Sequence, residues 1–147
     1  MKRAVSTLTI WSIVWGVFMF IFFSGEGAVG FAQEKSRRIW GAALFALGYI
    51  AYFITLFKTR AKKKGESVLT DERDEAIVQR SGNIAFIFTL CVVFLLCITL
   101  WDAFQKSGMV PVGWMWFIAY TTSFLAMISN SLVIIILNKR MSGHGES

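Results

Sequence analysis

Four long stretches without a charged residue dominate this chain of 147 residues. They are Ala4–Phe23, Ile39–Phe57, Ser81–Trp101 and Met109–Leu137, and each holds at least 19 residues. A helix of about 20 apolar residues, rising about 1.5 Å per residue, crosses a bilayer core about 30 Å thick. The sequence therefore predicts four transmembrane helices.

The composition favours a membrane domain over a soluble one. Only 16% of the residues are charged and 56% are hydrophobic, whereas a soluble domain carries about 25% charged residues. We expect an all-α fold in which the four helices form two hairpins of a single membrane domain, residues 1–147. The expected helices span about 4–23, 39–57, 71–101 and 112–137, separated by a basic and acidic loop, 58–80, and followed by a flexible tail, 141–147.

The positions of lysine and arginine predict the orientation in the membrane. The N-terminus, residues 58–80 and the tail carry 11 of the 15 basic residues, and the other two loops carry four. Basic residues in short loops favour the cytoplasmic side, so we expect both termini to be cytoplasmic. Lys35, Arg37 and Arg38 then lie on the opposite side, against this rule.

Two alternatives compete with the arrangement of four spans. A re-entrant segment or a three-helix arrangement would bring Lys35, Arg37 and Arg38 to the cytoplasmic side. Separately, Lys2 and Arg3 before an apolar stretch resemble a signal peptide, but the stretch is longer than the usual apolar region of about 7–15 residues.

Small and polar residues mark the expected helix contacts. Gly41 and Gly48 lie seven residues apart on one face of the second helix, and Thr122, Ser129 and Asn130 form a stripe on the fourth. Small residues let helices approach closely inside a bilayer. Asn130 lies deep in its helix, and we expect it to form a hydrogen bond with another helix.

The residues needed for catalysis or metal binding are not found in the sequence. Cys91 and Cys97 lie about 120° apart on one helix, where we expect them to be packing residues, and His144 lies alone in the tail. No phosphate-binding glycine loop, nucleophile elbow or zinc-protease motif is present. The uncharged stretches also lack the ionisable residue that ion-coupled transporters usually need. We expect no enzymatic activity, no cofactor and no metal.

The long polar segment Ser67–Asn83 is predicted to form the start of the third helix. Thr70 is a suitable N-cap, and Asp71 and Glu72 favour the positive end of the helix dipole. From there the pattern continues without proline to Trp101, so the helix extends into the cytoplasm. None of its four carboxylates, at positions 71, 72, 74 and 75, has a basic residue three or four positions later.

Three interpretations of this acidic face remain open: a solvated helix start, pairing with lysines of the preceding loop, or a docking surface for another protein. The residues of the expected docking segment are Asp71, Glu72, Arg73, Asp74, Glu75, Ile77 and Arg80. A basic cluster lies nearby and is expected to contact anionic lipid headgroups rather than nucleic acid. Its members are Lys58, Arg60, Lys62, Lys63 and Lys64.

The segment "LTDERDEAIVQRSGN", followed by an apolar helix, resembles a group of small prokaryotic multi-pass membrane proteins. These share an Asp-Glu-Arg motif, an aliphatic residue and a basic residue before a membrane helix, which here correspond to residues 71–73, Ile77 and Arg80. The resemblance covers about residues 69–101 and the general helix layout. It implies a prokaryotic cytoplasmic membrane location, and the group is functionally uncharacterised.

Two functions of different classes follow from these observations. The first is a non-enzymatic accessory or regulatory subunit that docks a protein partner through residues 70–80. The alternative is a small transporter or channel subunit that forms a homo-oligomer around the stripe Thr122–Asn130. An oligomer with substrate-dependent flux would distinguish the second from the first.

Overall fold

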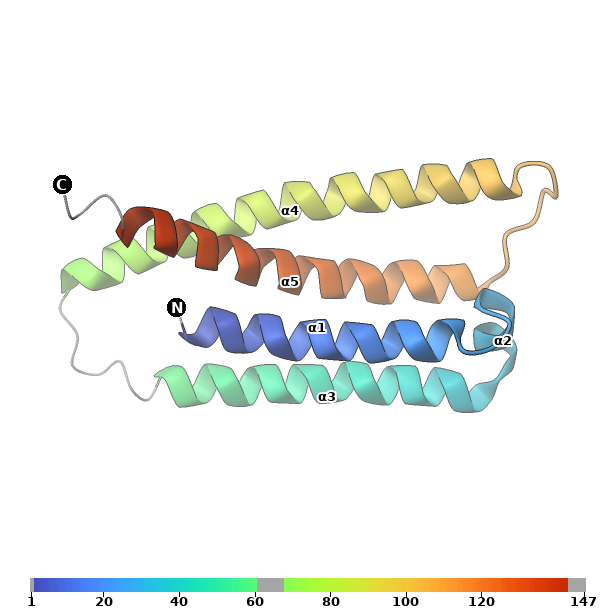
Figure 1. Ribbon diagram of the computed structural model, residues 1–147, viewed down its shortest axis with the longest axis horizontal. Helices are drawn as coiled ribbons and strands as arrows, with labels where there is room; N and C mark the ends of the chain where they lie inside the picture. The colour runs from blue at the N-terminus through green and yellow to red at the C-terminus, as the bar shows by residue number, and fades with distance from the viewer. Residues whose placement is uncertain (1, 61–67, 143–147) are drawn as a thin grey trace.

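The computed structural model describes residues 2–60 and 68–142, and within them all side chains except those of residues 59–60, 68–74 and 141–142. The described residues form four long helices and one short one (Figure 1). The helices are α1 (Lys2–Phe23), α2 (Ala28–Gln33), α3 (Lys35–Arg60), α4 (Val68–Phe104) and α5 (Gly113–Ser142). The four long helices are each long and apolar enough to cross a membrane, which confirms the predicted all-α fold with four spans.

The long helices lie in a row in the order α4, α5, α1, α3 (Figure 1). Helices α1 and α3 form one hairpin, α4 and α5 form the other, and contacts between α1 and α5 join the two hairpins. Within the described residues, α3 and α4 lie at opposite edges and do not pack on one another. The two central helices, α1 and α5, accordingly bury a larger share of their residues than the two edge helices do.

The start of α1 and the end of α5 lie at the same end of the row (Figure 1). We call this the terminal end; it holds the start of α1, the end of α3, the start of α4 and the end of α5. The opposite end, which we call the α2 end, holds α2 and the turn between α4 and α5. An even number of spans produces this arrangement, because each pair of helices returns the chain to the side from which it entered.

Side-chain hydroxyls inside the long helices hydrogen-bond to their own backbone. Thr9, Thr55, Thr89 and Thr122 each donate to the carbonyl oxygen four residues earlier, over 2.7–3.0 Å. In a bilayer no water is available to satisfy these groups, and a helix satisfies its backbone internally. The threonines can therefore lie within the spans without needing a partner on another helix.

The aromatic core lies where α1 meets α3 and α5. Ring centroids lie 5.2 Å apart for Trp11 and Tyr49, 5.0 Å for Phe18 and Tyr120, and 4.8 Å for Phe22 and Phe117. Trp11, Phe18 and Phe22 are fully buried. Rings of α1 between Trp11 and Phe22 thus fill the space between the three helices.

The helix boundaries extend beyond those expected from the sequence. Helix α3 begins at Lys35 rather than at 39, and α4 begins at Val68 rather than at 71, so that Thr70 lies inside the first turn and not at the N-cap. Helix α1 begins at Lys2, and α5 continues to Ser142. The charged residues that limit an apolar stretch are compatible with helical backbone, so a helix can continue past the membrane-crossing part of its sequence.

The short helix α2 is not anticipated by the sequence. It follows Gly27, whose φ of 57° is accessible to glycine without strain. Its Phe31 is buried, and a Cβ at Gly113 of α5 would overlap the carbonyl oxygen of Ala28. Six residues are too few for a helical period to be recognised in sequence. In the structure, α2 closes one end of the row over α1, α3 and α5.

Candidate functional site

The first turns of α4 form the segment that the sequence singles out for docking. The helix starts at Val68, and its uncharged stretch starts at Ser81. Val68–Arg80 therefore adds roughly three to four helical turns before that stretch, with no break between them. The Asp-Glu-Arg motif at positions 71–73 lies on a continuous helix rather than in a loop.

The residues of the expected docking segment differ in how far their side chains are exposed. Glu75 and Arg80 are exposed, and neither has an ion pair within the described part of the chain. Ile77 is only 4% exposed and packs inside the protein. Asp71, Glu72, Arg73 and Asp74 are helical, and their side chains lie outside the described residues. Ile77 therefore holds the segment to the rest of the molecule, while Glu75 and Arg80 face outward.

A stripe of buried residues attaches α4 to its neighbour. Ile77, Ser81, Ala85 and Thr89 are all buried and recur every fourth position. Residues four apart share one face of a helix, and among the described residues α5 is the only helix on which α4 packs extensively. Three of the four side chains are small, so the two helices can approach closely. We call these four residues the α4 stripe.

One hydrogen bond crosses this seam near the terminal end. The hydroxyl of Ser81 lies 2.9 Å from Oδ1 of Asn130 and 2.8 Å from the carbonyl oxygen of Val78. Ser81 is fully buried. This is the interhelical hydrogen bond that the sequence analysis expects for Asn130. It ties α5 to α4 one turn after Ile77, at the base of the docking segment.

The α4 stripe is not among the helix contacts predicted from the sequence, although the sequence carries a signal for it. Ser81, Ala85 and Thr89 repeat the pattern of small residues four apart that favours close contact in membranes. Cys91 and Cys97, which we interpreted as packing residues, are instead exposed on the outer surface of α4. The spacing of the small residues, and not the cysteines, locates the contact face of this helix.

The small residues expected to mediate helix packing lie at seams within the chain. A Cβ on Gly48 would be 2.8 Å from Cζ3 of Trp11, and one on Gly41 would be 3.1 Å from Cζ of Phe31. Ser129 is buried, while Thr122 and Asn130 are partly buried. Gly41 and Gly48 leave room for rings of neighbouring helices, and Asn130 bonds to α4.

The basic cluster is only partly within the described residues. Lys58 is exposed in the last turns of α3. Arg60 belongs to α3, but its side chain lies outside the described residues, as do Lys62, Lys63 and Lys64 altogether. Across residues 2–60 and 68–142, no group of three or more histidine, cysteine, aspartate or glutamate side chains could hold a metal ion.

Arg37 is one of the basic residues expected on the non-cytoplasmic side, and it has a local structural role. It forms an ion pair with Glu34 at the start of α3, and only 20% of its side chain is exposed. A side chain on Gly25 would overlap its guanidinium. Arg37 therefore packs into the turn between α1 and α2 instead of standing free in the loop.

The four membrane-length helices, joined as two hairpins, define a multi-pass α-helical membrane protein. More particularly, the chain belongs to the family described as "Predicted membrane protein (DUF2178)", whose model matches residues 9–141. That match includes most of the first span, all of the other three, and the whole docking segment. No curated protein and no solved structure matches the chain.

Proposed function

We propose that this protein is a non-enzymatic accessory or regulatory membrane subunit that docks a protein partner through residues 70–80. The observation that carries the proposal is the unbroken passage of α4 from the charged segment into the span. Buried Ile77 and the hydrogen bond between Ser81 and Asn130 fix the base of that segment on α5. A rigid, anchored helix end loses little conformational entropy when a partner binds.

The charge pattern indicates the chemistry of the partner. Four carboxylates at positions 71, 72, 74 and 75 have no basic residue three or four positions later on their helix. Within the described residues, Glu75 is exposed and has no ion pair. Complementary charge across an interface accelerates association and excludes wrong partners. We infer that the partner presents a basic surface to this segment.

The proposed location is the cytoplasmic membrane of a prokaryote, with both termini in the cytoplasm. The start of α1 and the end of α5 lie at the terminal end of the row. The N-terminus, residues 58–80 and the C-terminal tail carry 11 of the 15 basic residues. The rule that basic loops remain in the cytoplasm supports this orientation. The docking segment then faces the cytoplasm, where a soluble regulator or the cytoplasmic part of a membrane complex can reach it.

Charge reversal in the docking segment tests the proposal. The triple variant Asp71→Lys, Glu72→Lys, Asp74→Lys should reduce recovery of cross-linked partner from native membranes by about tenfold or more, because like charges then face each other. Added lysines on this side agree with the orientation rule, so the variant should still insert correctly. Quantitative cross-linking mass spectrometry measures the recovery.

A matched control adds positive charge to the same side away from the segment. The variant in which each of residues 143–147 is replaced by lysine changes only the C-terminal tail and adds the same six positive charges as the triple reversal. Its partner recovery should remain that of the unaltered protein. Unchanged recovery with the triple reversal would contradict docking through residues 70–80. Equal losses in both variants would instead indicate a general effect of charge.

The alternative, an oligomeric transporter or channel subunit, receives less support. It requires the stripe Thr122–Asn130 to face other copies, yet Ser129 is buried within the chain and Asn130 bonds to Ser81. Helix α5 also lies between α4 and α1 in the row. Substrate-dependent flux in liposomes that changes with Asn130→Leu would favour this alternative.

A further inference from the structure

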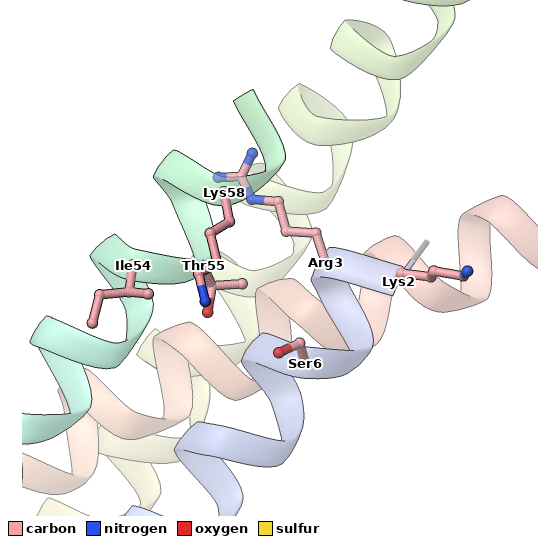
Figure 2. A pocket seen from close by; sticks show the side chains of 6 residues that line it. All are labelled: Lys2, Arg3, Ser6, Ile54, Thr55 and Lys58. Carbon is pink, nitrogen blue, oxygen red and sulfur yellow. The ribbon is translucent and has the colours of Figure 1, made fainter. Parts of the chain in front are cut away.

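A cleft of about 380 Å³ opens between the first turns of α1 and the last turns of α3 (Figure 2). Lys2, Arg3 and Ser6 of α1 line one side, and Ile54, Thr55 and Lys58 of α3 line the other. In Figure 2, Arg3 extends from α1 toward α3, where Lys58 and Thr55 lie. Basic residues more than 50 positions apart in sequence, Arg3 and Lys58 among them, therefore line one cleft.

The cleft carries positive charge that the described residues do not neutralise. Among the described residues, Lys2, Arg3 and Lys58 are its three charged lining residues, and no carboxylate of that part of the chain lines it. None of the three forms an ion pair within the described part of the chain. Several cations held around one space, without a counter-charge, attract an anion.

The cleft lies at the depth of the lipid headgroups. The uncharged stretch of α1 begins at Ala4 and that of α3 ends at Phe57, so the basic residues lie directly outside the ends of both stretches. Ile54 lies one turn deeper in α3 and gives the cleft an apolar wall. An occupant with an anionic head and an apolar part fits both features.

Hydroxyl and guanidinium groups supply the geometry for a phosphate. Arg3 offers a planar set of donors that binds phosphate oxygens in pairs. The Ser6 hydroxyl points toward α3 in Figure 2 and has no hydrogen bond among the described residues. The Thr55 hydroxyl donates to the carbonyl oxygen of Ala51 over 2.8 Å, so the donors to a phosphate are the other polar groups of the cleft.

We propose that this cleft binds the phosphate of an anionic membrane lipid, held by Arg3, Lys58 and Lys2 between α1 and α3. The site differs from the diffuse basic cluster expected from the sequence, because Lys2, Arg3 and Ser6 come from the other helix of the hairpin. It is also separate from the docking segment, which lies on α4 at the edge of the row. A bound lipid links the ends of α1 and α3.

Native mass spectrometry of the full chain tests the site by measuring how much added lipid stays bound when the protein is released from detergent. The added lipid is phosphatidylglycerol or phosphatidylcholine. The variant Arg3→Gln, Lys58→Gln should retain less phosphatidylglycerol, by about fivefold for each basic residue removed. Phosphatidylcholine, whose headgroup carries a cation, should be retained weakly by both proteins. Circular dichroism checks that the variant is still helical, and the two single variants should each show part of the loss.

The matched control removes two cations at the same end of the molecule but outside the cleft. Lys139 and Arg140 are exposed in the last turns of α5, so Lys139→Gln, Arg140→Gln makes the same change in charge. The control should retain phosphatidylglycerol as the unaltered protein does. Equal losses in the two double variants, or no loss in the cleft variant, would overturn the proposal.

A second arm distinguishes a lipid from a free anion. Excess inorganic phosphate is added to the lipid-loaded protein, and its binding to lipid-free protein is measured by calorimetry. A lipid site should keep its phosphatidylglycerol, because Ile54 and the bilayer contribute to lipid binding alone. Displacement of the lipid by phosphate, with phosphate binding to the lipid-free protein, would reassign the cleft to a soluble anion.

Discussion

The seam between α1 and α3 and the seam between α4 and α5 are packed in different ways. Between α1 and α3, the large ring of Trp11 fits against Gly48, with Phe45 and Tyr49 at 6.3 and 5.2 Å beside it. Between α4 and α5, the α4 stripe presents small residues, and Ser81 bonds to Asn130. One hairpin is joined by interlocking rings, and the other by close approach and a polar contact.

This difference shows two solutions to one physical problem. Lipid tails are as apolar as the side chains, so burial alone does not drive helices together inside a bilayer. Large rings gain dispersion contacts over a wide area, whereas small residues gain them by bringing backbones close. The first seam should therefore be most sensitive to loss of side-chain volume, and the second to changes in its polar contact.

The largest effect is expected from truncating the ring at the centre of the aromatic seam. Trp11→Ala should lower the free energy of unfolding by about 3–5 kcal/mol, because it leaves a cavity among α1, α3 and α5. The indole Nε1 has no hydrogen-bond partner among the described residues, so Trp11→Phe should cost much less. Unfolding in mixed detergent micelles measures both. Trp40→Ala, at a residue 64% exposed, serves as the control.

A smaller effect is expected from filling the space opposite that ring. Gly48→Ala places a Cβ 2.8 Å from Cζ3 of Trp11, and the resulting overpacking should cost about 1–3 kcal/mol. Gly16→Ala is the matched control, since nothing lies within 4 Å of its added Cβ. That variant should be neutral or stabilising, because alanine favours the helix. Equal effects of the two substitutions would refute the interlocking of Trp11 with Gly48.

The smallest effect is expected at the polar contact of the other hairpin. A double-mutant cycle with Ser81→Ala and Asn130→Leu should give a coupling energy of about 0.6 kcal/mol, the average for hydrogen bonds between membrane helices. The control cycle combines Ser81→Ala with Asn83→Leu, because Asn83 is exposed on α4. This pair should show no coupling energy. Zero coupling between Ser81 and Asn130 would show that their hydrogen bond does not stabilise the contact between α4 and α5.

The sequence predicts the helices of this fold better than their arrangement. Uncharged length identifies all four spans, because the bilayer sets the number of apolar residues needed to cross it. The order α4, α5, α1, α3 does not follow from such a pattern, since helices that are apolar on every side show no preferred contact face. Gly48 marks a contact in sequence, but only the structure shows that Trp11 fills the space beside it.

For the candidate site, the sequence likewise predicts the helix but not the contacts that its side chains make. Helical spacing places residues 71–80 on a helix, and the structure agrees. The burial of Ile77 is not predicted from the sequence, although Ile77 lies four residues before Ser81 and so shares a face with the small residues of the α4 stripe. The basic cleft combines Arg3 and Lys58 across the hairpin. Only the register of α1 against α3, set by ring packing, brings these two residues to one depth.

The row of helices has a consequence for assembly that resembles the behaviour of a β-sheet. A row has two open sides, and here they are the outer surfaces of α3 and α4, where Phe57 and Phe94 are among the exposed residues. Another helix can join either side without separating any pair that is already in contact. Association of this kind extends the row, as an added strand extends a sheet, and leaves the arrangement of the existing helices unchanged.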